Sequence, residues 1–131
     1  MKGLDTNVLV RYLTLDDEAQ AARAVEVIEG AARTGETLFV SRVVMCELVW
    51  VLEVAYRSTR EEILGALESI LRTAQMHFED KDVLLQALAD YREGRGDFAD
   101  YVIGREAVSA GCSSTWTFDQ DLASSTMFEV L

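Results

Sequence analysis

The segment VVMCELVWVL (residues 43–52) holds one ionisable side chain, Glu47, among nine apolar residues. These flanks predict that Glu47 lies inside a buried helix. An isolated buried carboxylate costs several kcal/mol unless it is paired, protonated or bound to a metal. Glu47 also stands too far inside its helix to act as a cap. We therefore expect partner groups for Glu47 elsewhere in the fold, and an ion pair with an arginine is the non-catalytic alternative.

Four aspartates lie where such partners are needed, at the ends of short elements. Asp5 ends a short N-terminal strand, Asp119 follows the segment TWTF, and Asp97 and Asp100 open a helix. Each also has a structural interpretation when it is taken alone. Asp5 and Asp97 are suited to helix capping, Asp100 to a first helical turn and Asp119 to a loop turn. Together with Glu47, these residues favour a metal-binding cluster of carboxylates.

The elements that must position these acids follow from hydrophobic periodicity and capping signals. Short β-branched or aromatic segments alternate with amphipathic helical patterns, which predicts an α/β fold with a mostly parallel central sheet of about five strands between two layers of helices. Parallel strands bring their carboxyl ends to one edge of a sheet, where ligands bind in such folds. The expected strands are residues 2–5, 37–40, 76–79, 113–118 and 128–131. Three helices are expected at residues 6–13, 16–33 and 98–110. Three more are expected after the cap residue Ser41, behind the capping box Thr59–Glu62 and after Asp80.

Length and composition are consistent with one compact domain covering residues 1–131. Cys46 and Cys112 form no CxxC pair and are expected to be reduced thiols. No apolar run approaches a membrane-spanning length, and no signal core is present, so we expect a soluble cytoplasmic protein. The net charge of −11 argues against a general electrostatic coating of nucleic acid, although carboxylates gathered around a metal contribute to that total.

The residue types narrow the chemistry of the predicted site. Oxygen ligands without histidine or cysteine suit a hard cation, Mg²⁺ or Mn²⁺. His77 is the sole histidine and is expected to be structural, which removes zinc HExxH sites, Ser-His-Asp triads and Cys-His pairs. No P-loop is present. The remaining chemistry is metal-assisted attack of water on a phosphate ester.

Four blocks of the sequence, in order, resemble the PIN-domain ribonucleases, and more narrowly the VapC toxins of type II toxin–antitoxin pairs. They are LDTNVLVRYLT-LDDEAQ, VSRVVMCELVWVL, GDFADYVIGREAVSAGC and TFDQDL, and they span nearly the whole chain. The resemblance implies that Asp5, Glu47, Asp100 and Asp119 are the catalytic and metal-binding acids. Asp97 and Asp121 are the alternative or auxiliary acids, and the supporting small polar groups are Thr6, Asn7, Ser41 and Thr117.

The same resemblance implies a homodimer that cleaves RNA with Mg²⁺ or Mn²⁺ and is neutralised by a small VapB-like antitoxin. Asp5 and Asp100 would hold the metal, Glu47 would orient or deprotonate the attacking water, and Asp119 would complete the site. Arg11, Arg42, Arg95 and Arg105 are candidates for contacts with the RNA backbone, with solvated surface positions as the default.

Two other functional classes remain open. A magnesium-dependent phosphatase or a phospho-receiver domain also places aspartates at strand ends, but those families need a lysine near the site, and this chain has only Lys2 and Lys81. A catalytically silent PIN fold that acts as an interaction module is the second alternative, and retention of a costly buried Glu47 argues against it. Trp50, Trp116 and Tyr56 are expected to belong to the core.

Overall fold

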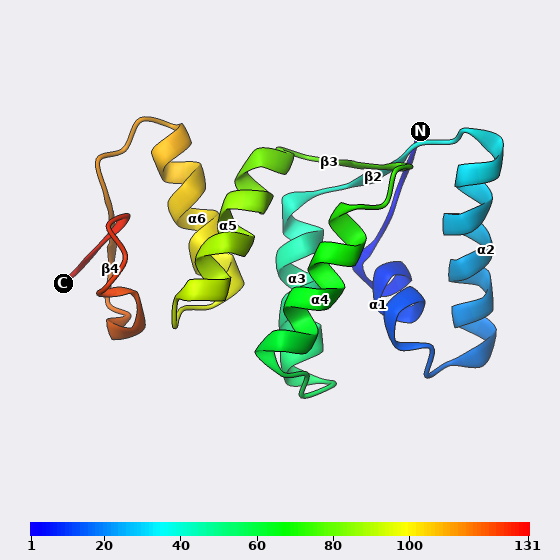
Figure 1. The fold of residues 1–131 in the computed structure, drawn as a ribbon, viewed down its shortest axis with the longest axis horizontal. Helices are drawn as coiled ribbons and strands as arrows, with labels where there is room; N and C mark the ends of the chain where they lie inside the picture. Colours follow the sequence, from blue (N-terminus) through cyan, green and yellow to red (C-terminus); the bar gives the residue numbers. More distant parts are fainter. The chain divides into compact units, whose positions relative to one another are not determined.

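The computed structural model describes residues 1–131, which form two compact units, Met1–Glu79 and Asp80–Leu131. Each unit is described by itself (Figure 1). No helix is long and apolar enough to cross a membrane.

The first unit contains three parallel strands and four helices. The strand order is β1-β2-β3, with Lys2 opposite Leu38 and Leu38 opposite Met76. Because neighbouring strands run in the same direction, helices must connect them, as the alternating pattern predicts. The elements are β1 (Lys2–Gly3), α1 (Thr6–Thr14), α2 (Glu18–Thr34), β2 (Leu38–Val40), α3 (Arg42–Val54), α4 (Arg60–Leu71) and β3 (Met76–Phe78).

Local sequence signals account for where these helices begin. The Ser41 hydroxyl accepts a hydrogen bond from the Val44 N–H at 3.1 Å at the start of α3. Thr59 and Glu62 form the predicted capping box of α4, with reciprocal bonds of 3.1 and 2.9 Å. Asp17 caps α2 by accepting from the Gln20 N–H at 3.0 Å. Each side chain satisfies a backbone donor that has no partner within its helix.

Helix α1 lies between α2 and α3 and packs against both (Figure 1). Leu9 and Val10 form its buried face. Helix α3 buries Met45, Leu48, Val49 and Leu52, whose spacing gives one side of a helix. The position of α1 matters for function because α1 begins directly after Asp5, and α3 carries Glu47.

The second unit pairs two helices with a small parallel sheet. Helices α5 (Lys81–Glu93) and α6 (Phe98–Ser109) pack together, with Tyr91 and Phe98 in an edge-to-face contact at 6.0 Å between ring centroids. The remaining elements are β4 (Thr115–Thr117), the short 3₁₀ helix η1 (Gln120–Leu122) and β5 (Phe128–Val130). Strands β4 and β5 pair in parallel, with Thr115 opposite Phe128.

The α/β class and the parallel strand direction are confirmed, but the five strands do not form the one central sheet that was expected. The hydrogen-bonded ladders form one three-stranded and one two-stranded sheet, each within its own unit. Strand β1 ends at Gly3, two residues earlier than predicted. Asp5 therefore belongs to the turn that starts α1 and not to the strand, because its backbone adopts the extended conformation of an N-cap residue.

Candidate active site

Asp5 occupies the N-cap position of α1 but does not act as a cap. Its backbone is extended, with φ −81° and ψ 158°, yet its carboxylate accepts no hydrogen bond from the first turn. The side chain is exposed and makes no ion pair. An aspartate at this position normally stabilises the helix through such a bond. The carboxylate of Asp5 thus remains available for another ligand.

Thr6 links the beginning of α1 to the middle of α3. Its hydroxyl donates a hydrogen bond to Oε1 of Glu47. Thr6 is 3% exposed and is the one buried polar residue of the chain. Because Thr6 is buried, its hydroxyl has few other acceptors, and the bond holds one oxygen of Glu47 in a defined place.

The prediction that Glu47 is buried is wrong, because the residue is exposed. Glu47 lies on a different side of α3 from Met45, Leu48 and Leu52, which face the core. Val43 and Trp50 share the solvent side with Glu47 and are 74% and 61% exposed. The apolar run therefore covers both sides of the helix. Because Glu47 is exposed, the cost of burying a charge does not apply to it.

The other two supporting residues predicted in this unit have different surroundings. Ser41 caps α3, as described above, through the Val44 N–H. Asn7 is exposed and lines a pocket together with Arg11 and Gln20. Of the predicted supporting groups in this unit, Thr6 alone donates to a candidate catalytic acid.

In the second unit, Asp97 and Asp100 meet at the start of α6. Asp97 is the N-cap residue, and Oδ2 of Asp100 accepts a hydrogen bond from its backbone N–H at 3.1 Å. Burial is the main cause that raises the pKa of Asp100 above its ordinary value, and the charges of Asp97 and Asp119 raise it further. The hydrogen bond from Asp97 opposes this shift. Asp100 is therefore a half-buried carboxylate among like charges, which is typical of functional acids and of cation sites.

Asp119 stands in a turn between β4 and η1. Its N–H donates to the hydroxyl of Thr117 at 3.0 Å, and its Oδ1 accepts from the Asp121 N–H at 2.9 Å. These bonds fix the orientation of the carboxylate and leave Oδ2 outside them. The charge of Asp119 contributes to the raised pKa of Asp100, and the charge of Asp121 does not. Asp119 and Asp100 are therefore close in space.

Sequence reasoning missed one feature of the loop before α6, and this feature positions Asp97 and Asp100. The Tyr101 hydroxyl accepts a hydrogen bond from the Gly96 N–H at 2.9 Å, within the loop before α6. A Cβ at Gly96 would collide with Leu122, and a Cβ at Gly94 would collide with the Tyr101 hydroxyl. The glycines of EGRGD therefore allow a close approach of backbone to side chain, and their pairing in a short loop was the available signal.

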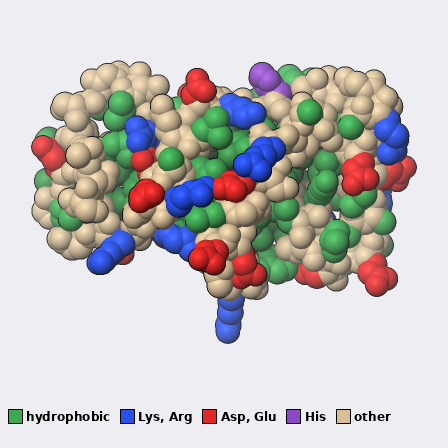
Figure 2. Space-filling view, in the orientation of Figure 1, with side chains coloured by type: hydrophobic (Ala, Val, Ile, Leu, Met, Phe, Trp, Pro, Cys, Tyr) green, Lys and Arg blue, Asp and Glu red, His purple; other side chains and the backbone are tan.

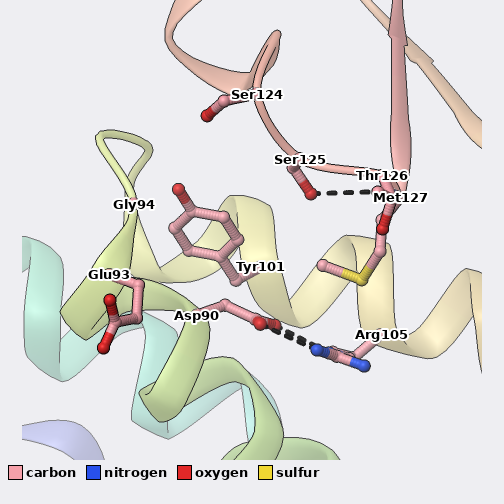
Figure 3. Close-up of a pocket in the computed structure, with 9 residues that line it drawn as sticks. All are labelled: Asp90, Glu93, Gly94, Tyr101, Arg105, Ser124, Ser125, Thr126 and Met127. Atoms are coloured by element: carbon pink, nitrogen blue, oxygen red, sulfur yellow. Dashed lines mark hydrogen bonds and ion pairs between the residues drawn. The ribbon is translucent and has the colours of Figure 1, made fainter.

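The second unit also contains a pocket of about 340 Å³ (Figure 3). Arg105 donates from Nε and Nη2 to Asp90 at 2.6 and 2.7 Å beside it. These hydrogen bonds raise the pKa of Arg105. Arg105, a predicted RNA contact, is thus held by a carboxylate. The lining residues are Asp90, Glu93, Gly94, Tyr101, Arg105, Ser124, Ser125, Thr126 and Met127.

The predicted site residues fall into two halves. The unit Met1–Glu79 holds Asp5 and Glu47, and Thr6, which directly follows Asp5, donates a hydrogen bond to Glu47. The unit Asp80–Leu131 holds the group of Asp97, Asp100 and Asp119. The structure contains no set of three or more Asp, Glu, His or Cys side chains arranged to hold a metal ion. The four-acid site remains a prediction.

Two expected core residues lie at the surface. Trp50 is 61% exposed and Trp116 is 72% exposed, so the prediction that they are buried is wrong. Trp116 lies on β4, and its indole N–H donates to Glu129 at 2.9 Å on the neighbouring strand. Tyr56 is partly buried, and its hydroxyl donates to Asp16 at 2.8 Å.

Comparison with known proteins agrees with this arrangement of helices and parallel strands. Residues 3–125 match the PIN domain family model. The chain is also 32% identical over 118 residues to the VapC ribonuclease of Aquifex aeolicus (strain VF5), which covers 90% of this chain and 87% of that protein. The matched range includes every predicted site residue. The chain belongs to the PIN-domain family, and its similarity to VapC is confirmed.

Proposed function

We propose that the chain is a single PIN domain, residues 1–131, that cleaves RNA as a VapC-type toxin with Mg²⁺ or Mn²⁺. In this proposal Asp5, Glu47, Asp100 and Asp119 act together, with Asp97 and Asp121 as auxiliary acids. Family membership and the likeness to a VapC ribonuclease support it.

The observation that carries the proposal is the unused carboxylate of Asp5. Asp17 stands at the equivalent position of α2 and caps that helix at 3.0 Å, whereas Asp5 makes no capping bond. An N-cap acid that leaves its helix donors unbonded gives up about 1 kcal/mol of stability. Stability given up at one residue indicates a functional requirement.

The donor chemistry of both halves fits a hard divalent cation. Asp100 and Asp119 are close enough for their charges to repel, and a cation would relieve that repulsion. Asp5 offers two free carboxylate oxygens. We propose that Asp5, Asp100 and Asp119 hold the ion, directly or through waters. When bound, such an ion stabilises charge on a phosphate ester and increases the acidity of water.

The residues of this chain would contribute orientation and proton transfer. Thr6 donates to Oε1 of Glu47, which leaves Oε2 to accept a proton from an attacking water. The exposure of Glu47 allows substrate and water to reach that oxygen. The bonds that Asp119 makes with its own turn hold its carboxylate in one orientation. Preorganised groups of this kind reduce the reorganisation needed for reaction.

The proposal includes the partners and location expected for such a toxin, namely a VapB-like antitoxin, an RNA substrate, a second copy of the chain and the cytoplasm. Membership of the PIN-domain family and the likeness to a VapC ribonuclease support this set of partners.

The decisive experiment is cleavage of total bacterial RNA by the purified chain, freed of antitoxin, with Mg²⁺, with Mn²⁺ and with EDTA. We expect discrete fragments that require the divalent ion. Asp5→Asn and Glu47→Gln should each reduce the rate by at least about 100-fold, as expected when a group that binds or activates the reacting water is lost. Asp17→Asn is the matched control, because asparagine is also a good N-cap residue and Asp17 lies outside the proposed site.

Three outcomes would contradict the proposal. Cleavage that survives both substitutions would indicate a contaminating nuclease. Intact RNA in every wild-type reaction, with the chain still folded, would favour the silent interaction module. Release of phosphate from a small monoester substrate, without RNA cleavage, would favour the phosphatase alternative.

A further inference from the structure

A pocket of about 280 Å³ lies between α1 and α2, within the first unit. It begins at Asn7, two residues after the candidate catalytic Asp5, and extends along α2. Its lining has a polar part and an apolar part. The residues are Asn7, Val8, Arg11, Gln20, Arg23, Ala24 and Val27.

The charge of this pocket is opposite to the charge of the chain. Two arginines and no carboxylate line it, although the protein has 23 acidic and 12 basic residues. On the face shown in Figure 2, Lys and Arg side chains are interspersed with Asp and Glu. A chain with this composition cannot bind RNA by a general basic coat, so it needs local cationic sites.

The two arginines are in different states. Arg11 donates from Nε to Gln20 at 2.7 Å and from Nη1 to Asp16 at 3.0 Å, so it is oriented and partly neutralised. Arg23 is exposed and makes no hydrogen bond or ion pair. A free guanidinium that lines a pocket is suited to bidentate recognition of a phosphate.

We propose that this pocket binds a phosphate of the RNA strand next to the cleavage site, with Arg23 as its main ligand. This inference rests on the proposed ribonuclease function. Arg23 supplies the guanidinium, and Asn7, two residues after Asp5 in the chain, supplies an amide donor. Val8, Ala24 and Val27 form the apolar wall, where the sugar and base of one nucleotide can pack.

Continuity with Asp5 favours an RNA strand over an acidic protein segment. A phosphodiester bound at Asp5 has further phosphates one nucleotide away on either side. The pocket includes Asn7 in the first turn of α1, the helix that begins directly after Asp5, so we expect a flanking phosphate of the same strand to lie near it. About half to two-thirds of the hydrogen bonds between proteins and DNA go to phosphate and sugar groups, and such contacts position the strand without reading its sequence.

The test compares Arg23→Gln with Arg33→Gln in the full-length protein. Both arginines are exposed on α2 and make no ion pair, but Arg33 lies outside this pocket. Binding of a fluorescein-labelled single-stranded RNA is measured by anisotropy in EDTA over a range of salt concentrations, so that no cleavage occurs. Cleavage is then measured separately with Mg²⁺ or Mn²⁺.

We expect Arg23→Gln to weaken RNA binding by about 5- to 20-fold and to lower the slope of log Kd against log salt by about 0.7, the value for one phosphate contact on a single strand. KM should rise with little change in kcat. Arg33→Gln should change binding by less than about twofold, and Arg23→Lys should retain the salt slope because it keeps the charge.

Equal effects of Arg23→Gln and Arg33→Gln on Kd and salt slope would overturn the subsite and leave the ribonuclease function standing. If the wild type cleaves no RNA, the proposed function falls, and the binding data in EDTA still decide whether the pocket holds a phosphate. Unchanged RNA binding by Arg23→Gln, together with lost inhibition by the antitoxin, would identify the pocket as a protein-binding site and overturn the RNA proposal.

Discussion

The Thr6 hydroxyl donates a hydrogen bond to Oε1 of Glu47, which lies 41 positions later in the chain. The donor is buried and the acceptor is exposed, so the bond ties a surface carboxylate to the core. Thr6 directly follows Asp5 at the start of α1. One contact therefore sets the position of Glu47 relative to the helix that begins at Asp5.

Thr6→Val should separate this positioning role from stability. Valine has nearly the same shape and lacks the donor, and Glu47 can be solvated instead. The free energy of unfolding should fall by only about 0.5–1.5 kcal/mol. We expect kcat for RNA cleavage to fall by about 10-fold or more because Glu47 loses its fixed orientation, and Thr6→Ser should restore it. Wild-type kcat in Thr6→Val would show that the bond has no part in catalysis.

Asp100→Asn should make the metal-free protein more stable and less active. The raised pKa of Asp100 means that the folded state binds its proton more tightly than the unfolded chain does. The ionised carboxylate therefore lowers stability at neutral pH, and this cost disappears as the pH falls through the raised pKa. Asparagine carries no charge and can still accept from the Asp97 N–H. We expect calorimetry in EDTA at pH 7 to show a Tm about 1–4 °C higher, with cleavage reduced by about 100-fold.

Asp82→Asn is the matched control for this comparison, because Asp82 is an exposed acid in the first turn of α5. Its removal loses a favourable interaction with the helix dipole, so the Tm should stay the same or fall slightly. A lower Tm for Asp100→Asn than for Asp82→Asn would contradict the view that Asp100 is destabilised by its surroundings.

Tyr56→Phe should make stability less sensitive to acid. The Tyr56 hydroxyl is the largest cause that lowers the pKa of Asp16, followed by Thr14 and, less strongly, by Arg11. A lowered pKa contributes stability above the ordinary value of 3.8, and this contribution is lost as the pH falls through the folded-state pKa. The wild type should therefore exceed Tyr56→Phe in Tm by about 1–3 °C at pH 7. The difference should shrink as the pH falls below 3.8 and through the lowered folded-state pKa. A difference that stays constant on acidification would rule out the linkage to Asp16.

Gly96→Ala should disturb the start of α6, where Asp97 and Asp100 lie, without changing any of the candidate acids. The new Cβ would collide with Leu122 and crowd the Tyr101 hydroxyl, whose bond to the Gly96 N–H holds this loop. We expect a loss of about 1–3 kcal/mol in unfolding free energy, as for other overpacked sites. Cleavage should also fall because Asp97 directly follows Gly96.

Gly65→Ala provides the contrast to Gly96→Ala. Gly65 is exposed in the interior of α4, and its Cβ would meet nothing within 4 Å. The substitution should raise the unfolding free energy by about 0.5–1 kcal/mol through helix propensity. Chemical denaturation of both variants measures these opposite signs, and destabilisation by Gly65→Ala would show that α4 has other constraints.

Local signals in the sequence were sufficient for most of the helices. Ser41 and the Thr59–Glu62 pair start α3 and α4 as predicted, because capping depends on atoms three residues apart. The helix expected after Asp80 is also present as α5, and its buried residues Val83, Leu84, Ala87, Leu88 and Tyr91 follow helical spacing. The α/β class followed from the alternation of these elements.

The sequence by itself determined the family blocks, the helix starts and the candidate acids, because each depends on residue types at short spacing. Only the tertiary structure decided that Glu47 is exposed, that Thr6 holds it and that Asp119 raises the pKa of Asp100. An apolar run cannot reveal which of its residues face solvent when both sides of a helix are apolar, as Val43 and Trp50 on α3 demonstrate. Contacts between residues dozens of positions apart arise from packing between elements, and no local pattern encodes them.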